Sequence, residues 1–517
     1  MSAKTTPKGL KEVTYNDAVA RSKEYFGGDE LAATVWVSKY ALKDSFGHIY
    51  ESSPEDMHHR IAAEIERIEK NYPNPLSRDE IFALLDHFRY VIPQGGPMTG
   101  IGNNLQIASL SNCFVIGHKK PADSYGGIIR MDEEQVQIMK RRGGVGHDLS
   151  HLRPTGSPVL NSALTSTGIV PFMERYSNST REVAQDGRRG ALMLTISIKH
   201  PDAERFIDAK VDTSKVTGAN VSVKIDDEFM RAAIAGKPYH QQFPIDAEKP
   251  MYEQDIDARA LWKKIIHNAW KSAEPGVLFW DTILRESIPD CYADEGFNTV
   301  STNPCGEIPL CPYDSCRLLA LNLYSYVDKP FTAEASFDFA KFRDHVGKAM
   351  RMMDDIIDLE LEKVEQIIAK IDADPEEADI RYVESNLWKK VREMALKGRR
   401  TGLGIRYGSD EAVAFAVEVH KTLALAAYGA SVEMAEERGA FPLYDAAREL
   451  DNPMIARIRE ADPALYERMV KSGRRNIAML TIAPTGTTSL MSQTTSGIEP
   501  VFRPIDKPRR KINPSDH

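Results

Sequence analysis

The segment 301–309, Ser-Thr-Asn-Pro-Cys-Gly-Glu-Ile-Pro, constrains the fold more than any other stretch of this chain. Its two prolines have no backbone N–H to give to a β-ladder, so the segment cannot be a well-paired central strand. We therefore expect a loop that is held inside a larger structure. If the segment is extended, Asn303, Cys305 and Glu307 project to one side, because successive side chains of an extended chain point to opposite faces. An amide, a thiol and a carboxylate on one face predict a reaction surface.

The length and charge of the chain limit its class. At 517 residues it is long for one hydrophobic core, since single cores stop growing near roughly 250–300 residues. We expect a large α/β unit with an additional domain. The formal net charge of −9 gives no electrostatic reason to expect nucleic acid or an anionic membrane as a partner. No stretch approaches the roughly 18 uninterrupted apolar residues of a membrane span, so we expect a cytoplasmic protein.

The cysteines indicate redox or catalytic thiols. There are five, which is too few and too odd a number for a disulfide scaffold. They are Cys113, Cys291, Cys305, Cys311 and Cys316. Zinc is a poor fit because the chain has no Cys-x-x-Cys pair, and the nearest histidine to the 305–316 cluster, His345, is far away in sequence. We therefore expect no bound metal.

The pattern of apolar residues changes near Gly95. Residues 10–95 have apolar groups at helical spacing, and Ser77 to Glu80 resembles a capping box, so residues 1–95 are predicted to form a small helical domain. From Gly95 onward, short apolar strands alternate with helices, which is typical of βαβ units and a parallel sheet. The expected strands are Cys113–Ile116, Leu192–Ile198, Val221–Ile225, Val277–Trp280, Gly402–Ile405 and Ile477–Ile482.

One long helix is predicted between the fourth and fifth of these strands. Apolar residues at spacings of three and four mark its buried face, and its methionines are interpreted as core. The members of this stripe are Phe339, Phe342, Val346, Met350, Met353 and Ile357. Residues 371–385 are rich in Asp and Glu and are expected to form a solvated surface insertion.

Four motifs together resemble a known family. Asn-Pro-Cys-Gly-Glu at 303–307, followed eleven residues after its thiol by Cys316, resembles the finger loop of the catalytic chain of ribonucleotide reductases. The similarity is greatest to the adenosylcobalamin-dependent class II enzymes. Agreement extends to Ser-Asn-Cys at 111–113, to the glycines and the His-Leu-Arg-Pro run within 143–154, and to 483–500. The first 95 residues match only loosely.

This resemblance implies a fold and a set of roles. It implies a ten-stranded α/β barrel of two five-stranded halves, occupying residues 96–517, with the finger loop in its middle. Cys305 would be the thiyl radical that removes the ribose 3′ hydrogen and later returns it. Glu307 would be the base for the 3′-hydroxyl, and Asn303 would position the sugar. The reducing pair would be Cys113 and Cys316, reset by an external dithiol. Cys291 and Cys311 match no family role, and we expect them to be core cysteines.

A phosphate-binding loop is expected directly after the strand at 477–482. Backbone N–H groups and hydroxyls in such a loop suit a ribonucleoside diphosphate or triphosphate, although an ordinary strand-to-helix turn is the alternative. The expected substrate-binding residues are Asn112, Pro484, Thr485, Gly486, Thr487, Thr488 and Ser489. The glycines at 143–146 lack the third glycine of a dinucleotide fingerprint, so we do not interpret them as a Rossmann motif.

A second nucleotide site is implied by the resemblance alone. In the family, a deoxynucleoside triphosphate effector binds at the interface of a homodimer and signals substrate choice to the active site. The positions that match are Asp123, Ser124, Arg153 and Lys215, the last within the loop 212–220. A solvated acidic turn and a flexible loop are the alternative interpretations.

The source of the radical decides the class. Class I enzymes receive the radical through a tyrosine pair near the C-terminus, and the chain contains no Tyr-Tyr; it also lacks the C-terminal glycine loop of the glycyl-radical class. The Asn-Pro-Cys form of the loop and the eleven-residue step to Cys316 resemble class II, and this resemblance implies adenosylcobalamin as the cofactor. Two alternatives stay open: a class I large subunit that receives its radical from a metal-containing partner, and a nucleotide-binding fragment without activity.

The last segment of the sequence suggests an incomplete barrel. The chain stops about 17 residues after Pro500, in a basic run with three prolines that would make a poor strand. A barrel without its closing strand would expose unpaired backbone edges. We expect a split or truncated reductase whose barrel is completed by a complementary C-terminal chain, with a minimal variant that closes the gap by rearrangement as the alternative.

Overall fold

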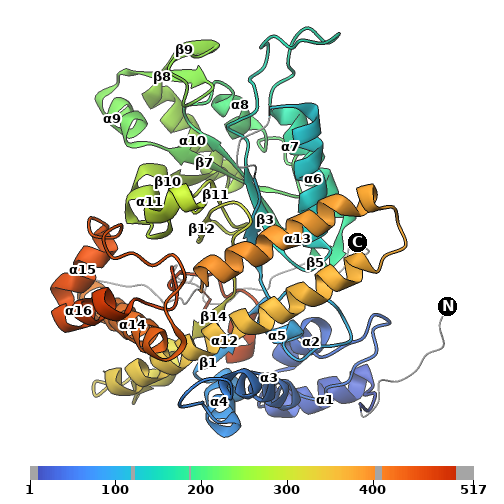
Figure 1. Cartoon of the computed structure of the whole chain (residues 1–517), viewed down its shortest axis with the longest axis vertical. Coiled ribbons are helices and arrows are strands. Elements are labelled where there is room, and N and C mark those ends of the chain that lie inside the picture. The colour runs from blue at the N-terminus through green and yellow to red at the C-terminus, as the bar shows by residue number, and fades with distance from the viewer. Residues whose placement is uncertain (1–9, 118–122, 186–187, 402–409, 497–517) are drawn as a thin grey trace.

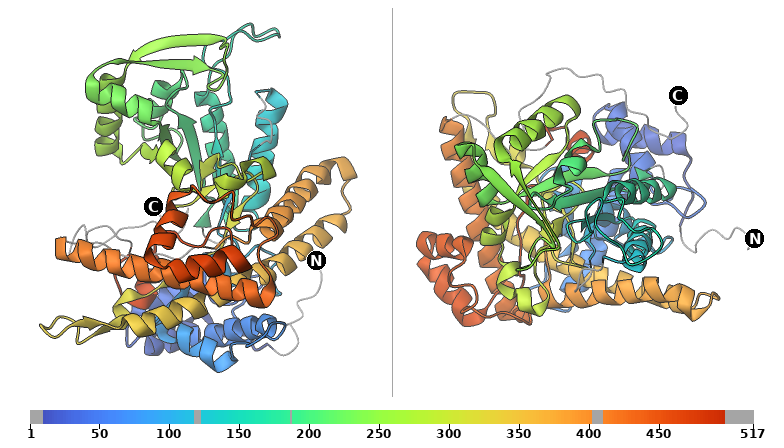
Figure 2. Two further views of the ribbon diagram at one scale, coloured as in Figure 1. Left: turned by 60° about the vertical axis from the view of Figure 1, so that its left-hand side comes forward. Right: turned by 90° about the horizontal axis from the view of Figure 1, so that it is seen from above.

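A computed structural model describes residues 10–117, 123–185, 188–401 and 410–496 (Figure 1). Figure 1 shows a sheet with its helices in the upper part of the molecule and the N-terminal helices at the bottom. Two long antiparallel helices, α12 (Phe339–Asp372) and α13 (Ala378–Gly398), cross between these parts. Figure 2 shows the same arrangement from two further sides.

The N-terminal residues are helical, as the sequence predicts. The helices are α1 (Tyr15–Tyr25), α2 (Glu30–Lys39), α3 (Pro54–Glu69) and α4 (Arg78–Leu85). The capping box at Ser77 and Glu80 is present, because each side chain accepts a backbone hydrogen bond from the other residue. These helices share one hydrophobic core with α12 and α14: Trp36, Ile61 and Met353 belong to the same buried cluster.

A six-stranded sheet forms the centre of the upper part, in the order β10-β7-β6-β3-β2-β13. Its strands are β2 (Cys113–Val115), β3 (Gly144–Asp148), β6 (Leu192–Ser197), β7 (Asn220–Ile225), β10 (Gly276–Phe279) and β13 (Ser315–Cys316). The first five strands in this order are parallel, and β13 is antiparallel to β2. Four of the strands confirm predictions to within two residues. The sequence reasoning missed β3 because glycine is depleted in strands.

Helices connect the parallel strands, as a parallel sheet requires. They are α6 (Tyr125–Met139), α7 (Val170–Glu182), α8 (Ala203–Asp208), α9 (Asp227–Ala235) and α10 (Ala258–Ser272), with α11 (Trp280–Glu286) after β10. The hairpin of β8 (Pro238–Phe243) and β9 (Tyr252–Asp257) lies beyond the sheet at the top of the molecule (Figure 2).

The predicted long helix is α12 (Phe339–Asp372). The predicted apolar stripe is buried from Phe342 to Ile357, whereas Phe339 is only partly buried. Most of the acidic segment 371–385 is exposed, as expected, and its second half begins α13 (Ala378–Gly398). The chain continues through α14 (Asp410–Arg438), α15 (Pro453–Ala461), α16 (Pro463–Ser472) and α17 (Thr488–Ser492).

Of the two later segments that were expected to be strands, one is not a strand and the other lies outside the described residues. The strand predicted at Ile477–Ile482 is wrong, because this segment joins no β-ladder. Its backbone is bonded instead to the end of α13 and to the segment that follows α13. The Ile477 N–H donates to the Gly398 carbonyl at 2.9 Å, and the Thr401 N–H donates to the Ala478 carbonyl at 3.0 Å. The expected strand Gly402–Ile405 lies outside the described residues.

The described residues form a mixed α/β fold in which no sheet closes into a barrel. Apart from the six-stranded sheet, their sheets are two-stranded. These pair β1 (Val91–Pro93) with β14 (Leu319–Leu321), β4 (Ala184–Gln185) with β5 (Arg188–Arg189), β8 with β9, β11 (Ser301–Thr302) with β12 (Pro309–Leu310), and β15 (Val327–Asp328) with β16 (Ser336–Phe337). Within the same ranges, no helix has the length and apolar character needed to cross a membrane.

Candidate active site

The segment 301–309 is a hairpin rather than an extended strand. Its base is the antiparallel pair β11 and β12, and the chain turns at 304–307, with Gly306 at a φ of 86°. Asn303 closes the turn: its carbonyl accepts from the Gly306 N–H at 3.0 Å, and its side-chain oxygen accepts from the Ile308 N–H at 3.0 Å. The segment is therefore a loop, as expected, but it is not extended through 303–307, because an asparagine side chain can bond to nearby backbone and stabilise a turn.

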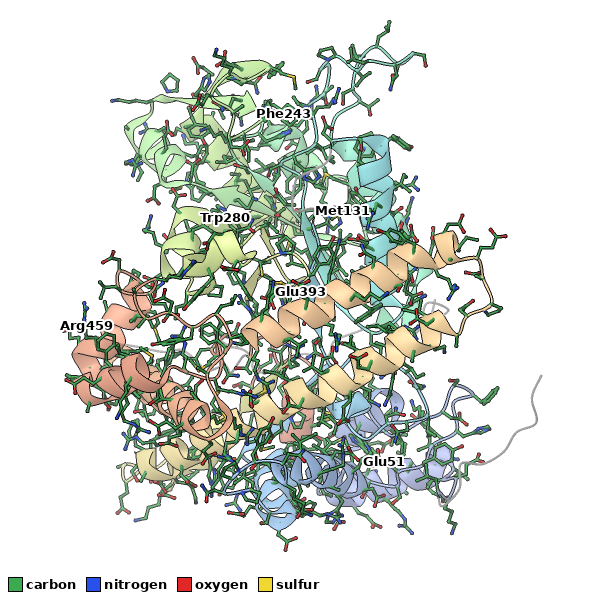
Figure 3. All side chains as sticks on the ribbon, in the orientation of Figure 1. Glu51, Met131, Phe243, Trp280, Glu393 and Arg459 are labelled. Atoms are coloured by element: carbon green, nitrogen blue, oxygen red, sulfur yellow. The ribbon has the colours of Figure 1, made fainter. Side chains whose placement is uncertain are left out.

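Side chains from the parallel strands hold the hairpin against the sheet. Thr195 of β6 shares a hydroxyl hydrogen bond of 2.9 Å with Ser301. From β7, the Asn220 amide donates to the Pro304 carbonyl at 2.8 Å. At the other end of β7, the Lys224 ammonium donates to the Val300 carbonyl at 3.2 Å and lies over the Trp280 ring, labelled in Figure 3. The hairpin thus runs from the carboxyl end of β7 to its amino end.

Glycines in β3 allow the hairpin to contact the sheet backbone. A Cβ atom at Gly146 would collide with the Thr302 carbonyl oxygen, and one at Gly144 would lie 2.8 Å from Pro304 Cγ. The motif at 143–146 therefore makes room for the hairpin. The sequence reasoning missed this role, although glycines inside a strand signal a close approach of another backbone.

The three residues expected on one face are brought together by the turn. The Asn303 amide donates to Glu307 Oε2 at 2.7 Å and to Cys113 Sγ at 3.3 Å. Asn303 is fully buried, Glu307 is half-buried and Cys305 is exposed. The amide thus links the carboxylate to one of the two expected redox thiols, while the Cys305 thiol stays accessible.

Burial changes the protonation of these groups. It raises the pKa of the Glu307 carboxyl, and the hydrogen bond from Asn303 opposes this shift. The Cys305 side chain is accessible from one side, but the protein around it removes much of the water near the thiol; this desolvation, together with the negative charge of Glu307, raises the pKa of the Cys305 thiol to about 11. At neutral pH Cys305 therefore keeps its S–H hydrogen, the form from which a hydrogen atom can be removed.

Cys113 and Cys316 lie directly opposite each other on β2 and β13. The Cα atoms of such antiparallel pairs are about 4.5–5.5 Å apart, which is within the range that a disulfide spans. Both cysteines are buried and free. Burial, and after it the charge of Glu307, raises the pKa of both thiols. Two cysteines far apart in sequence are thus placed where a disulfide can form.

The two remaining cysteines lie elsewhere. Cys311 is buried, with its thiol 3.6 Å from Asp314 Oδ2. Cys291 is half-buried in a 3₁₀ helix, Pro289–Glu295. Neither lines the cavity beside Cys305; Cys311 belongs to a buried hydrophobic cluster, and Cys291 packs against the same cluster.

A cavity of about 420 Å³ joins the hairpin to the expected phosphate loop. Of the predicted site residues, Cys113, Cys305, Glu307, Asn112 and the loop 484–488 line it. Ser489 does not line it; this residue lies in α17 beside a neighbouring cleft of about 100 Å³. The Asn112 side chain is held at the cavity wall, since its oxygen accepts from the Gly96 N–H and its nitrogen donates to the Gln94 carbonyl at 3.4 Å.

Several lining residues were not predicted from the sequence, and Tyr40, Gln94 and Arg142 are those among them with a polar side chain. Among the described residues, Arg142 is the one Arg or Lys that lines this cavity. Its φ of 75° places a non-glycine residue in the left-handed region, a feature that recurs at functional sites. Arg142 directly precedes the glycines at 143–146, and this position was the signal in the sequence that could have indicated it. Tyr40 had none, because it is far from every motif.

Of the four expected effector residues, Asp123 and Arg153 are in contact, whereas Lys215 is not bonded to the others in the described ranges. Arg153 Nε lies 2.6 Å from Asp123 Oδ2, and Ser124 caps α6 by accepting from the Gly127 N–H at 3.1 Å. Lys215 is exposed in the segment before β7, and no hydrogen bond or ion pair within the described ranges joins it to the other three. No group of three or more His, Cys, Asp or Glu in these ranges could hold a metal ion.

Comparison with known proteins gives consistent matches. The chain is 32% identical over 477 residues to a vitamin B12-dependent ribonucleoside-diphosphate reductase of Mycobacterium tuberculosis (strain CDC 1551 / Oshkosh), covering 91% of this chain and 62% of that protein. It is 32% identical over 439 residues to a protein of the same name from Thermoplasma acidophilum, covering 82% of this chain and 49% of the relative. A ribonucleoside-diphosphate reductase subunit alpha of Chlamydia pneumoniae is 24% identical, covering 82% and 43%.

The chain thus spans about two fifths to three fifths of the length of these relatives. The sequence model of one family, described as the barrel domain of ribonucleotide reductase, matches residues 111–513. The match includes the hairpin at 301–309, the cysteine pair of β2 and β13, and the loop at 484–488. This chain belongs to the ribonucleotide reductase barrel-domain family.

Proposed function

We propose that this chain reduces ribonucleotides to 2′-deoxyribonucleotides by thiyl-radical chemistry, for the synthesis of DNA precursors. The observation that carries the proposal is the single cavity in which Cys305, Glu307 and Cys113 lie together with the loop 484–488. The names of the relatives support the same activity. A nucleotide-binding fragment without activity would not need a base, an exposed thiol and one thiol of a facing cysteine pair at one cavity.

The arrangement suits the chemistry of the reaction. Hydroxide is a poor leaving group on an unactivated carbon, and a radical at the neighbouring 3′ carbon removes this difficulty. Cys305 takes the 3′ hydrogen atom and returns it at the end. Glu307 accepts the 3′-hydroxyl proton while the 2′ oxygen leaves as water. Cys113 and Cys316 together supply two electrons and two protons and become a disulfide, which an external dithiol reduces again.

The substrate we propose is a ribonucleoside diphosphate, in line with the names of two relatives, with the triphosphate as the alternative. The threonine hydroxyls and backbone N–H groups of 484–488 would bind the phosphates, and Arg142 would balance part of their charge. Asn112 would contact the sugar side of the substrate, and the buried Asn303 would position the sugar through its hydrogen bond to Glu307. Ser489 would support the loop through its backbone, since its N–H donates to the Thr485 carbonyl at 2.8 Å.

Adenosylcobalamin is the cofactor we propose, as in the relatives named vitamin B12-dependent. When bound, it supplies a carbon-centred radical that takes a hydrogen atom from a thiol. The exposed and protonated Cys305 fits this demand, because the thiol is open to a reactant and keeps its S–H hydrogen. A class I large subunit with a metal-containing partner is the alternative that the experiment below distinguishes.

Several further features are part of the proposal. Five parallel strands, β10 to β2, support one half of a ten-stranded barrel in residues 96–517. The pair of Arg153 and Asp123, together with Ser124, supports a deoxynucleotide effector site at a homodimer interface, with Lys215 reaching it from its loop. A cytoplasmic location agrees with the free cysteines.

Turnover with labelled CDP and CTP tests this proposal. We expect deoxycytidine products from the purified chain with adenosylcobalamin and dithiothreitol, and no product from Cys305→Ser, because a hydroxyl O–H bond is too strong to yield the radical. Cys291→Ser is the matched control and should retain activity. Product formation by Cys305→Ser would exclude the assigned thiyl. Turnover that needs a metal-containing partner protein instead of cobalamin would favour class I.

A further inference from the structure

Tyr40 connects the N-terminal helices to the active-site cavity. It is the C-cap residue directly after α2, is 1% exposed and lines the same cavity as Cys305. Its hydroxyl donates to Thr487 Oγ1 at 2.9 Å, across a sequence separation of 447 residues. A residue of the helical N-terminal part therefore touches the loop that we propose to bind phosphate.

The helices α1 and α2 also support the end of this loop. Met491 of α17 is buried in the same hydrophobic cluster as Trp36 of α2. Beyond α17, the Gln493 amide donates to the Phe26 carbonyl at 3.1 Å. The loop 484–488 and the short helix α17 after it are thus held against α1 and α2. The contact of Tyr40 with Thr487 lies where α2 meets the cavity.

The direction of the Tyr40 hydrogen bond has a chemical consequence. A threonine hydroxyl has one hydrogen to donate and two lone pairs that accept. Because Thr487 accepts from Tyr40, its own hydrogen is available to another acceptor, and the cavity lies beside it. A phosphate oxygen is a strong acceptor of such a bond.

We propose that Tyr40 is a positioning residue of the substrate site, which orients the Thr487 hydroxyl so that it donates to a phosphate oxygen of the nucleotide. The proposal rests on the proposed function of the cavity. It makes the N-terminal helices part of the substrate site, although none of the motifs that identify the family lies in them.

The test compares CDP with cytidine, which lacks the phosphates. Tyr40→Phe removes one hydroxyl and keeps the ring, and we expect it to raise the Kd for CDP by about fivefold to tenfold, the effect of one hydrogen bond, while the Kd for cytidine stays the same. Equilibrium dialysis on the full chain measures both. Tyr50→Phe is the matched control, because Tyr50 donates to Asp44 at 3.0 Å outside this cavity and should change neither constant.

A double-mutant cycle distinguishes an effect on the orientation of the Thr487 hydroxyl from a general loss of order in the substrate site. Thr487→Val should reproduce the selective loss of CDP affinity, and the Tyr40→Phe, Thr487→Val double variant should bind CDP no more weakly than Thr487→Val alone. Equal losses for CDP and cytidine, or additive effects of the two substitutions, would overturn the proposal. If wild-type chain forms dCDP while Tyr40→Phe binds CDP normally, only the positioning role fails. Absence of CDP binding by the wild-type chain would overturn both proposals.

Discussion

At the residue scale, one buried amide organises the candidate site. Asn303 closes the hairpin with its oxygen, while its nitrogen donates to Glu307 and to Cys113. The charge of Glu307 in turn raises the pKa of the thiols around it. The protonation of base and thiols is therefore coupled, and the coupling can be measured without turnover.

Glu307→Gln should make Cys305 more reactive. The neutral amide removes the negative charge that helps to raise the pKa of Cys305 to about 11, so this pKa should fall, although burial will keep it above the ordinary value. We expect faster alkylation of Cys305 by iodoacetamide near pH 9, measured by mass spectrometry of the 305-containing peptide. Alkylation of Cys291 serves as an internal reference. An unchanged rate ratio would show that the carboxylate does not act on this thiol.

The pH dependence of turnover should report on Glu307. The raised pKa means that the protonated carboxyl persists to a higher pH than in an ordinary glutamate, whose pKa is about 4.3. A protonated carboxyl cannot accept the 3′-hydroxyl proton, so kcat should fall as the pH decreases through this raised pKa. Single-turnover rates between pH 5 and 8 measure it. A profile that falls only at the pKa of an ordinary glutamate, with the range extended to pH 4, would contradict the assignment of Glu307 as the base.

At the element scale, the register of β2 and β13 decides which thiols can pair. Cys113 faces Cys316 across the ladder, and Cys311 lies before the start of β13. After one turnover without reductant we expect a disulfide between Cys113 and Cys316, detected by mass spectrometry of unreduced peptides. Cys311→Ser should leave this disulfide intact. A bridge from Cys305 to Cys311, or from Cys311 to Cys316, would show that other thiols carry the electrons.

The contact between β3 and the hairpin gives a second prediction at this scale. Gly146→Ala would place a methyl group against the Thr302 carbonyl oxygen and push the hairpin from the sheet. We expect loss of turnover and a changed alkylation rate of Cys305, while the far-ultraviolet circular dichroism stays close to wild type. Gly126→Ala is the matched control, because nothing lies within 4 Å of a Cβ there and alanine suits its position in α6. Normal turnover of Gly146→Ala would mean that the hairpin does not need this contact.

At the scale of the whole molecule, a buried ionic network joins the N-terminal helices to the rest. Arg438 of α14 is fully buried and pairs with Glu69 of α3, with Asp354 at 3.1 Å and with Asp355 at 2.9 Å on α12. Arg399 adds a bond of 2.7 Å to Asp354. Nearby arginines hold the pKa of Asp354 at about 2 against the effect of burial, so its contribution to stability is complete above about pH 4 and is lost as the pH falls towards 2.

Arg438→Leu should destabilise the chain by about 3–5 kcal/mol, because it leaves buried carboxylates without their partner. Urea unfolding followed by circular dichroism measures the change. Arg448→Leu is the matched control: Arg448 pairs with Asp294 at 2.5 Å on the surface, and such pairs contribute about 0–1 kcal/mol. Equal effects of the two substitutions would show that the buried network does not tie the helices together.

Some of this protein is determined by the sequence alone. The N-terminal helices, four strands of the sheet and the apolar stripe of α12 follow from local periodicity, which depends only on residues close together in the chain. The residue types at 303–307, the cysteines and the threonine-rich loop 484–488 indicated the chemistry of the site, because the type of a side chain decides which reactions it can take part in. Their protonation in the folded chain depends on burial and on neighbouring charges, which the sequence does not give.

Only the tertiary structure decided how these parts meet. Periodicity does not report contacts between distant segments or local side-chain bonds to the backbone. The turn at 304–307 depends on such a local bond. Contacts between distant segments bring the hairpin to Gly146, Cys113 to Cys316 and Tyr40 to Thr487. The same limit explains the wrong strand at 477–482, since an apolar run becomes a strand only when another backbone pairs with it. The physical reason is that a β-ladder and a cavity are made by non-local contacts, and a linear pattern carries no distance between residues far apart in the chain.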